Sequence, residues 1–400
     1  MTPETPSDAP IAGAWRLVWW LSLAQLCSWG TLYYAVTVFV APMQAELGWS
    51  RAELLTAVTI GLLAAGVTAP LVGAWMDRHG GRLTMTAGSL IGGLLMIAWS
   101  QVEDLLAFYA IYAGIGAMQA LTLYEPAFAV VTANLGAQYR KGITTMTLLG
   151  GLASTVFIPL SQFLIDRIGW RDTLVVLGLV NLLLCAGIHL VMLRGTRASA
   201  MPPAPGGASP LRRALAMPVF WMIALSFTAY GAVFTGMTFH LIPVLTDAEV
   251  DSAWAVAIFA IVGPMQVAGR LAVLWLGRRL DGVRLGKLSV SCLPLSLLLL
   301  IAMPSFLPGL FVFAALYGLG NGTMTIVRGT AVPDMVGREA YATLNGAIAA
   351  PSLFARAIAP AAFGAVWLAV GGYGPVLWIM FAISLAGAGA FWLAAARAKG

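Results

Sequence analysis

Long apolar runs, separated by short polar or charged stretches, cover most of the 400-residue chain. An apolar run of 18 or more residues is long enough to cross a bilayer as a helix. We predict twelve such helices, over residues 15–40, 52–76, 83–100, 105–134, 142–165, 171–193, 217–245, 252–276, 284–303, 306–333, 341–367 and 371–396. The pattern therefore predicts an all-α membrane protein with twelve transmembrane helices.

The widest break between the runs is rich in proline, glycine and arginine, a composition typical of a linker. It divides the chain into a tail (1–14), a first six-helix bundle (15–193), a linker (194–216) and a second six-helix bundle (217–400). Tyr112 and Tyr317 recur at an offset of about 200 residues, as do Pro159 and Pro360. This recurrence favours two related, pseudo-symmetric halves.

Composition excludes a soluble protein, because 60% of the residues are hydrophobic, only 10% are charged and the mean hydropathy is +0.88. Soluble domains carry about 25% charged residues. The net charge of +6 comes from basic residues scattered among apolar runs, so we expect no nucleic-acid partner. The three cysteines lie inside apolar runs without metal-ligand spacing, and we expect neither a metal site nor a disulfide framework.

Lysines and arginines are concentrated in every second loop between the predicted helices. Sixteen of the 22 lysines and arginines fall at the start of the first predicted helix, in the linker, at the C-terminal end, or in and beside every second loop, whereas the opposite loops hold acids. By the positive-inside rule, both termini face the cytoplasm. The tail lacks the basic region and short apolar core of a cleaved signal peptide. We expect a monomeric, multi-pass protein of a bacterial inner (plasma) membrane, surrounded by the lipid bilayer.

A charged turn joins the second and third predicted helices. Its residues Gly73, Asp77, Arg78, Gly80 and Arg82 have the spacing Gly-x-x-x-Asp-Arg-x-Gly-x-Arg. This spacing resembles the loop signature of major facilitator superfamily transporters. The resemblance implies two six-helix bundles with a substrate site between them near the bilayer midplane.

The same resemblance implies that the turn is a gating motif that clamps the cytoplasmic ends of the halves. Asp77 can pair with Arg78 or Arg82, or meet the positive N-terminus of a facing helix. The alternative is that the two arginines only fix the topology.

Arg270 follows Gln266 by four residues, which puts both side chains on one helical face. This stretch resembles the eighth helix of the monocarboxylate porters, within the branch that also holds oxalate–formate antiporter-like proteins. There an aspartate precedes, by four residues, an arginine that binds the substrate carboxylate. The resemblance implies a substrate-binding role for Arg270, with Gln266 beside it, but not the family's aspartate-based proton coupling. The alternative is that Arg270 extends to the membrane interface.

Only four charged residues fall well inside the predicted helices: Glu125, Arg270, Arg328 and Arg356. Charges in the hydrocarbon region are costly and are functional candidates by default. We predict that Arg328 and Arg356 contact substrate, although either could instead bind a neighbouring helix. Glu125 is a candidate for proton coupling, and its alternative is a fixed ion pair with an arginine. His240 could also titrate, or be structural.

Tyr34 and Tyr124 would supply aromatic rings with polar tips to a substrate cavity, or pack within the bundle. The leading hypothesis is a secondary transporter for a small organic anion, such as a monocarboxylate, working by proton symport or by antiport against another anion. The alternative is an efflux pump of the same superfamily for drugs, metalloids or other toxic compounds.

An enzyme or a sensor is less consistent with the sequence. It contains no Gly-x-Ser-x-Gly elbow, no nucleotide-binding loop and no cluster of metal-ligand type, and neither terminus is long enough for an output domain. We therefore predict no catalytic residue and no cofactor.

Overall fold

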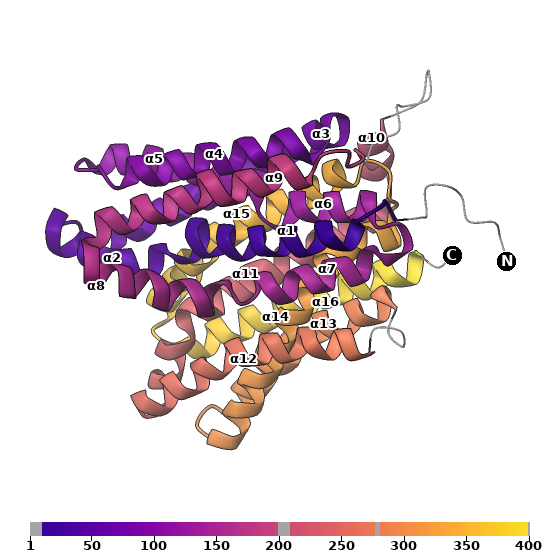
Figure 1. The fold of residues 1–400 in the computed structure, drawn as a ribbon. Helices are drawn as coiled ribbons and strands as arrows, with labels where there is room; N and C mark the ends of the chain where they lie inside the picture. Colours follow the sequence, from indigo (N-terminus) through magenta and orange to yellow (C-terminus); the bar gives the residue numbers. More distant parts are fainter. Residues whose placement is uncertain (1–9, 199–208, 277–280, 399–400) are drawn as a thin grey trace. The chain divides into compact units, whose positions relative to one another are not determined.

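The computed structural model describes residues 10–198, 209–276 and 281–398, and all regular structure within them is helical. Figure 1 shows the helices in chain order. The α-helices are α1 (Ala14–Ser28), α2 (Val36–Leu47), α3 (Arg51–His79), α4 (Gly81–Trp99), α5 (Leu105–Thr122), α6 (Tyr124–Asn134), α7 (Tyr139–Gly150), α8 (Ala153–Leu179), α9 (Ala186–Met192), α10 (Pro210–Leu215), α11 (Pro218–Asp247), α12 (Ser252–Leu276), α13 (Gly282–Ala302), α14 (Leu307–Met335), α15 (Tyr341–Val370) and α16 (Tyr373–Arg397). The π-helical segments η1 (Trp29–Tyr34) and η3 (Val180–Cys185) and the 3₁₀ turn η2 (Gly136–Gln138) complete the set.

Eleven stretches of the described helices are long and apolar enough to cross a membrane. One of them, Gly136–Met192, has 57 residues and would be about 85 Å long as a single helix. Its backbone turns at Gly169, where φ is 79°, so this stretch supplies two crossings. The prediction of an all-helical membrane protein with twelve apolar helices is therefore confirmed.

The chain forms two compact units. One contains Met1–Gly207 together with Arg338–Ala350, and the other contains Ala208–Gly337 together with Pro351–Gly400. Helix α15 therefore begins in the first unit and continues in the second from Pro351 onward. The predicted tail and linker lie partly outside the described residues, and the described part of the linker includes the short helix α10.

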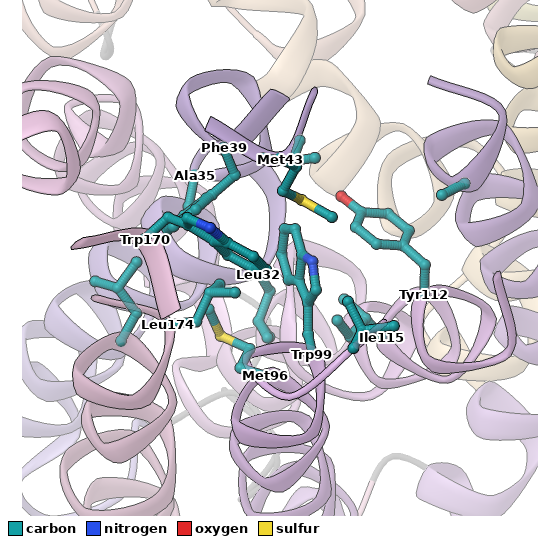
Figure 2. Close-up of a cluster of buried hydrophobic side chains, with 14 of the residues drawn as sticks. Leu32, Ala35, Phe39, Met43, Met96, Trp99, Tyr112, Ile115, Trp170 and Leu174 are labelled. Atoms are coloured by element: carbon teal, nitrogen blue, oxygen red, sulfur yellow. The ribbon is translucent and has the colours of Figure 1, made fainter. Parts of the chain in front are cut away.

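A hydrophobic cluster centred on Trp99 holds the first unit together (Figure 2). The Trp99 ring lies 5.4 Å from Phe39, 5.6 Å from Phe108 and 5.5 Å from Tyr112, measured between ring centroids. Aromatic pairs at such separations add about 0.5–1.5 kcal/mol each to the burial of their surfaces. The cluster fixes α2, α4 and α5 against one another.

Four predicted helices are interrupted rather than continuous: the first, the fourth, the fifth (between α7 and α8) and the sixth (at η3). The first apolar run widens into the π-helical segment η1 and extends to Leu47, beyond the predicted end at residue 40. The fourth breaks at Leu123, between α5 and α6. Pro126 has no N–H to donate to the Thr122 carbonyl, and it lies in the first turn of α6, where no such bond is needed.

Two glutamine side chains satisfy backbone carbonyls at these interruptions. Gln25 donates to the Thr122 carbonyl at 2.7 Å, and Gln119 donates to the Leu32 carbonyl at 2.7 Å. Both glutamines are buried. Irregular backbone at membrane depth requires such internal partners, so the two bonds hold α1, η1 and α5 in fixed positions.

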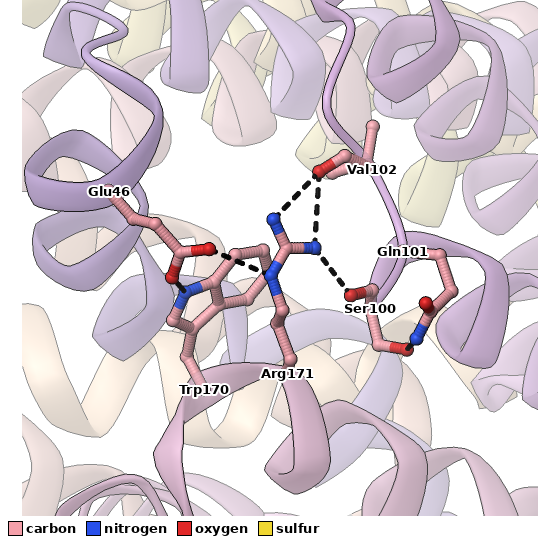
Figure 3. A network of polar contacts seen from close by, with 6 residues as sticks. All are labelled: Glu46, Ser100, Gln101, Val102, Trp170 and Arg171. Carbon is pink, nitrogen blue, oxygen red and sulfur yellow. Dashed lines mark hydrogen bonds and ion pairs between the residues drawn. The ribbon is translucent and has the colours of Figure 1, made fainter.

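Arg171, on α8, connects this helix to α2 and to the segment that follows α4 (Figure 3). Its Nε donates to Glu46 at 2.9 Å, and its terminal nitrogens donate to the carbonyls of Ser100 and Val102 at 2.7 and 3.2 Å. Trp170 donates its indole N–H to the same glutamate. Because Ser100 and Val102 follow the C-terminus of α4, where carbonyls lack helical partners, Arg171 closes that end.

Candidate functional site

The Asp77 carboxylate binds the N-terminus of α15. Asp77 is buried near the end of α3, and it accepts hydrogen bonds from the backbone N–H groups of Ala342 at 3.2 Å and Thr343 at 2.7 Å. These N–H groups lie in the first turn of α15 and have no partner inside the helix. The sequence left several partners open for Asp77, and the structure shows it bonded to one of them, the N-terminus of a facing helix.

Glycines bring the two helix backbones together beside this contact. A Cβ atom on Gly73 would lie 2.2 Å from the Ala342 carbonyl oxygen, and one on Gly346 would lie 2.5 Å from the Ala69 carbonyl oxygen. Only residues without a side chain fit at these two positions. The close approach of α15 therefore explains why the turn signature has a glycine at position 73 in this chain.

The remaining residues of the turn have separate surroundings. Gly80 has φ 77°, a left-handed conformation that favours glycine, and it ends α3. Arg82 donates from Nε to the Leu190 carbonyl at 2.9 Å, whereas Arg78 is exposed.

Arg338, just before α15, adds a second contact to this region that sequence reasoning missed. Its guanidinium carbon lies 4.9 Å from the ring centroid of Tyr139, a buried residue at the start of α7. Cation–π pairs of this kind contribute about 0.5–2 kcal/mol. Tyr139 and Arg338 are 199 positions apart, and no pattern in a single sequence links two residues so distant.

An aromatic group forms around η1. The Trp29 ring lies 6.0 Å from Tyr34 and 4.9 Å from Tyr124, measured between centroids. The Trp29 indole nitrogen is buried and has no hydrogen-bond partner within the described residues. Glu125 comes next to Tyr124 and is half-buried in the first turn of α6. The structure therefore gathers Tyr34, Tyr124 and Glu125 in one part of the first unit.

Arg270 lies in a closely packed region of the second unit. Its side chain is only 5% exposed, and its Nε atom has no hydrogen-bond partner within the described residues. A Cβ atom on Gly322 would lie 2.2 Å from the Gln266 carbonyl oxygen, and one on Gly318 would lie 2.6 Å from that of Val262. Small residues four positions apart allow such close approach of membrane helices. Arg270 is thus buried within the second unit.

The other two intramembrane arginines differ from Arg270. Arg356 is half-buried in α15 and donates from Nε to the Thr235 hydroxyl at 3.3 Å. Its aliphatic part lies beside Gly231, where an added Cβ atom would come within 3.1 Å of it. Arg328 is half-buried in α14.

His240 uses both ring nitrogens. Nε2 lies 2.9 Å from the Pro360 carbonyl oxygen, and Nδ1 lies 3.0 Å from the Tyr373 hydroxyl. A carbonyl only accepts, so Nε2 carries the proton and Nδ1 accepts from Tyr373 in the neutral ring. These contacts are separate from that of Arg356 with Thr235.

The described helices thus define an integral membrane protein with multiple crossings, half-helices and buried charges, the class to which membrane transporters belong. The family model of the Major Facilitator Superfamily matches residues 21–293. The chain belongs to the Major Facilitator Superfamily, and its members are transporters rather than enzymes.

Curated relatives are monocarboxylate transporters. Monocarboxylate transporter 13 of Rattus norvegicus is 26% identical over 306 residues, covering 75% of this chain and 70% of the relative. Monocarboxylate transporter 11 of Homo sapiens is 26% identical over 317 residues, covering 76% of this chain and 59% of the relative. These relatives support a transporter of the monocarboxylate-like branch.

Solved structures share the fold. The human organic anion transporter MFSD10 (TETRAN) has a TM-score of 0.73 at 17% identity, covering 95% of this chain and 100% of that chain. FucP in the outward conformation has a TM-score of 0.72 at 12% identity, covering 94% and 97%. At these identities the likeness concerns the fold alone.

Proposed function

We propose that the chain is a secondary active transporter that moves a small organic anion, such as a monocarboxylate, by alternating access. The observation that carries this proposal is the buried Arg270, whose Nε has no partner within the described residues. A buried guanidinium N–H that makes no hydrogen bond costs about 1–3 kcal/mol, and a bound carboxylate would offset this cost, because a guanidinium can donate two parallel hydrogen bonds to it. The monocarboxylate transporters among the relatives support the same substrate class.

The proposed substrate-binding residues are Arg270, Arg328, Arg356, Gln266, Tyr34 and Tyr124. Arg270 would bind the carboxylate, and Gln266 precedes it by one helical turn. To the set we add Trp29, because its buried indole N–H is available to donate a hydrogen bond beside Tyr34 and Tyr124.

The driving force in this proposal is either a proton or a counter-anion. If a proton drives transport, Glu125 would carry it, because this side chain is half-buried in the first turn of the short helix α6. His240 is a second carrier. Protonation of its Nδ1 requires only that the Tyr373 hydroxyl change from donating to accepting.

The turn that contains Gly73, Asp77, Arg78, Gly80 and Arg82 would act as a gate. Asp77 holds the first turn of α15, a helix that continues into the second unit after Pro351. Proline removes a helical hydrogen bond and allows bending at that point. Release of Asp77 would therefore free the beginning of α15 when the transporter changes state.

The topology in this proposal follows from the distribution of basic residues, with both termini and the gate on the cytoplasmic side of the plasma membrane. One chain would be the functional unit. Cysteine labelling from either side of the membrane would test the orientation.

Uptake into proteoliposomes tests the proposed function most directly. The probes are lactate and its neutral analogue lactamide, with and without a pH gradient. We expect lactate uptake to exceed lactamide uptake at least tenfold, and Arg270→Gln to abolish the difference. Equal transport of both compounds by the native protein would refute anion selectivity. Extrusion of toxic compounds from a sensitised host, without lactate uptake, would favour the efflux alternative.

A further inference from the structure

An apolar groove of about 460 Å³ lies between α3 and α4. It is lined by Leu71, Val72, Trp75, Leu83, Thr84, Ala87 and Leu121. Leu71 is 68% exposed and Leu83 is 62% exposed, so the groove opens to the surroundings of the first unit. In a membrane-spanning protein those surroundings are lipid chains.

The groove exists because α5 packs closely against both α3 and α4 and leaves a space between these two helices. A Cβ atom on Gly116 of α5 would lie 2.0 Å from the Gly61 carbonyl oxygen of α3, and one on Gly88 of α4 would lie 2.6 Å from Cβ of Leu121. Helix α5 thus packs closely on both neighbours, whereas α3 and α4 make few contacts with each other. The space left between them has Leu121 as its floor.

A positively charged end adjoins the groove. Arg78 and His79 follow Trp75 by three and four residues on α3, so they lie on the same helical face as the groove. Both are exposed. The His79 ring stacks on Trp75 with 3.9 Å between centroids, and its Nδ1 donates to the Trp75 carbonyl at 3.1 Å. Trp75 itself is 53% exposed, as is typical of tryptophans at the membrane interface.

We propose that this groove is a binding site for an anionic glycerophospholipid. One acyl chain lies between α3 and α4 on Leu121, and the headgroup phosphate lies at Arg78, with His79 beside it. The charge of the site selects this occupant, since basic groups at the membrane surface favour anionic over neutral lipids. The apolar lining provides the remaining binding energy through burial of the chain.

The site lies on the segment that contains Asp77, but on a different face. Asp77 is buried and bonded to α15, whereas Arg78 and Trp75 are exposed. Lipid binding at Arg78 and the contact of Asp77 with α15 can therefore be tested by separate substitutions.

Native mass spectrometry of the full-length protein in detergent tests the proposal. The probes are phosphatidylglycerol, phosphatidylcholine with the same acyl chains, and glycerol phosphate without chains. We expect the native protein to prefer phosphatidylglycerol about fivefold, the factor for one surface charge. Arg78→Gln should remove this preference. The matched control Arg397→Gln, which removes an exposed arginine at the end of α16, should keep it.

A second pair of variants tests the groove itself. Ala87→Leu and Ala87→Phe place increasing volume among the lining residues, and we expect a graded loss of both bound lipids. Three results would each overturn the proposal: no preference in the native protein, equal loss in Arg78→Gln and Arg397→Gln, or unchanged lipid retention in both Ala87 variants. Competition by glycerol phosphate alone would also contradict it, because the acyl chain would then be dispensable.

Discussion

The Asp77 carboxylate accepts a 2.7 Å hydrogen bond from the backbone N–H of Thr343, 266 positions further along the chain. A second bond, from the N–H of Ala342, makes the aspartate a cap for the first turn of α15. A carboxylate at a helix N-terminus gains from the bonds and from the helix dipole. The contact gives the aspartate of the turn a physical role, which is to dock α15 on α3.

Asp77→Asn should weaken this docking. The amide keeps one accepting oxygen but loses the charge, and its NH₂ group cannot accept from the second N–H. A cost of about 1–2 kcal/mol corresponds to a shift of about five- to thirtyfold in the balance of conformations. We expect a lower transport rate with nearly unchanged substrate affinity, measured by flux and by equilibrium binding. An unchanged rate would refute the gate.

Gly73→Ala should disturb the same contact sterically. The added Cβ would lie 2.2 Å from the Ala342 carbonyl, so α15 has to move. We expect slower transport and a lower melting temperature. Gly187→Ala is the matched control, because Gly187 lies within helix α9 with nothing within 4 Å of an added Cβ. Similar behaviour of the two variants would show that the close approach at Gly73 has no functional role.

Much of the fold could be predicted because apolar length is a strong signal. The membrane-crossing helices and the turn at Gly80 follow from the lengths of the runs and from glycine. The break at Leu123 and the π-helical segment η1 did not, since neither changes the apolar pattern. The only local sign of the break was Pro126.

The candidate site could be predicted only in part. Sequence position identified Asp77 and Arg270 as candidates, but the partner of Asp77 and the burial of Arg270 depend on packing between distant helices. The pairing of Tyr139 with Arg338 and the burial of the Trp29 indole N–H are also long-range effects. Such contacts leave no periodic trace in a single sequence.

Arg270→Met should uncouple stability from substrate binding. The substitution removes a buried charge whose Nε lacks a partner, so the ligand-free protein should unfold at the same temperature or higher. The rise in melting temperature caused by lactate should disappear. Arg356→Met is the contrasting variant, because it breaks the bond to Thr235 and should lower stability. A lactate-dependent shift that persists in Arg270→Met would exclude Arg270 from the substrate site.

Glu125→Gln should remove the response to a pH gradient if protons drive transport. A glutamine at the start of α6 keeps the shape of the side chain but cannot take up a proton. We expect gradient-driven lactate uptake to fall at least tenfold, whereas exchange of lactate across the membrane continues. Glu103→Gln, at an exposed position, is the control. Native flux that is indifferent to pH would leave anion exchange as the coupling mode and rule out the role of Glu125.

Arg171 and Glu46 should differ in their contributions to stability, although they form one ion pair. Their side chains are 29% and 49% exposed, and an exposed pair contributes only about 0–1 kcal/mol. Arg171 also donates to the carbonyls of Ser100 and Val102 at the end of α4, and each lost bond of this kind costs about 1 kcal/mol. We therefore expect Arg171→Gln to lower the melting temperature clearly more than Glu46→Gln. Thermal unfolding in detergent measures both, and equal effects would show that the ion pair, rather than the closing of α4, is the stabilising contact.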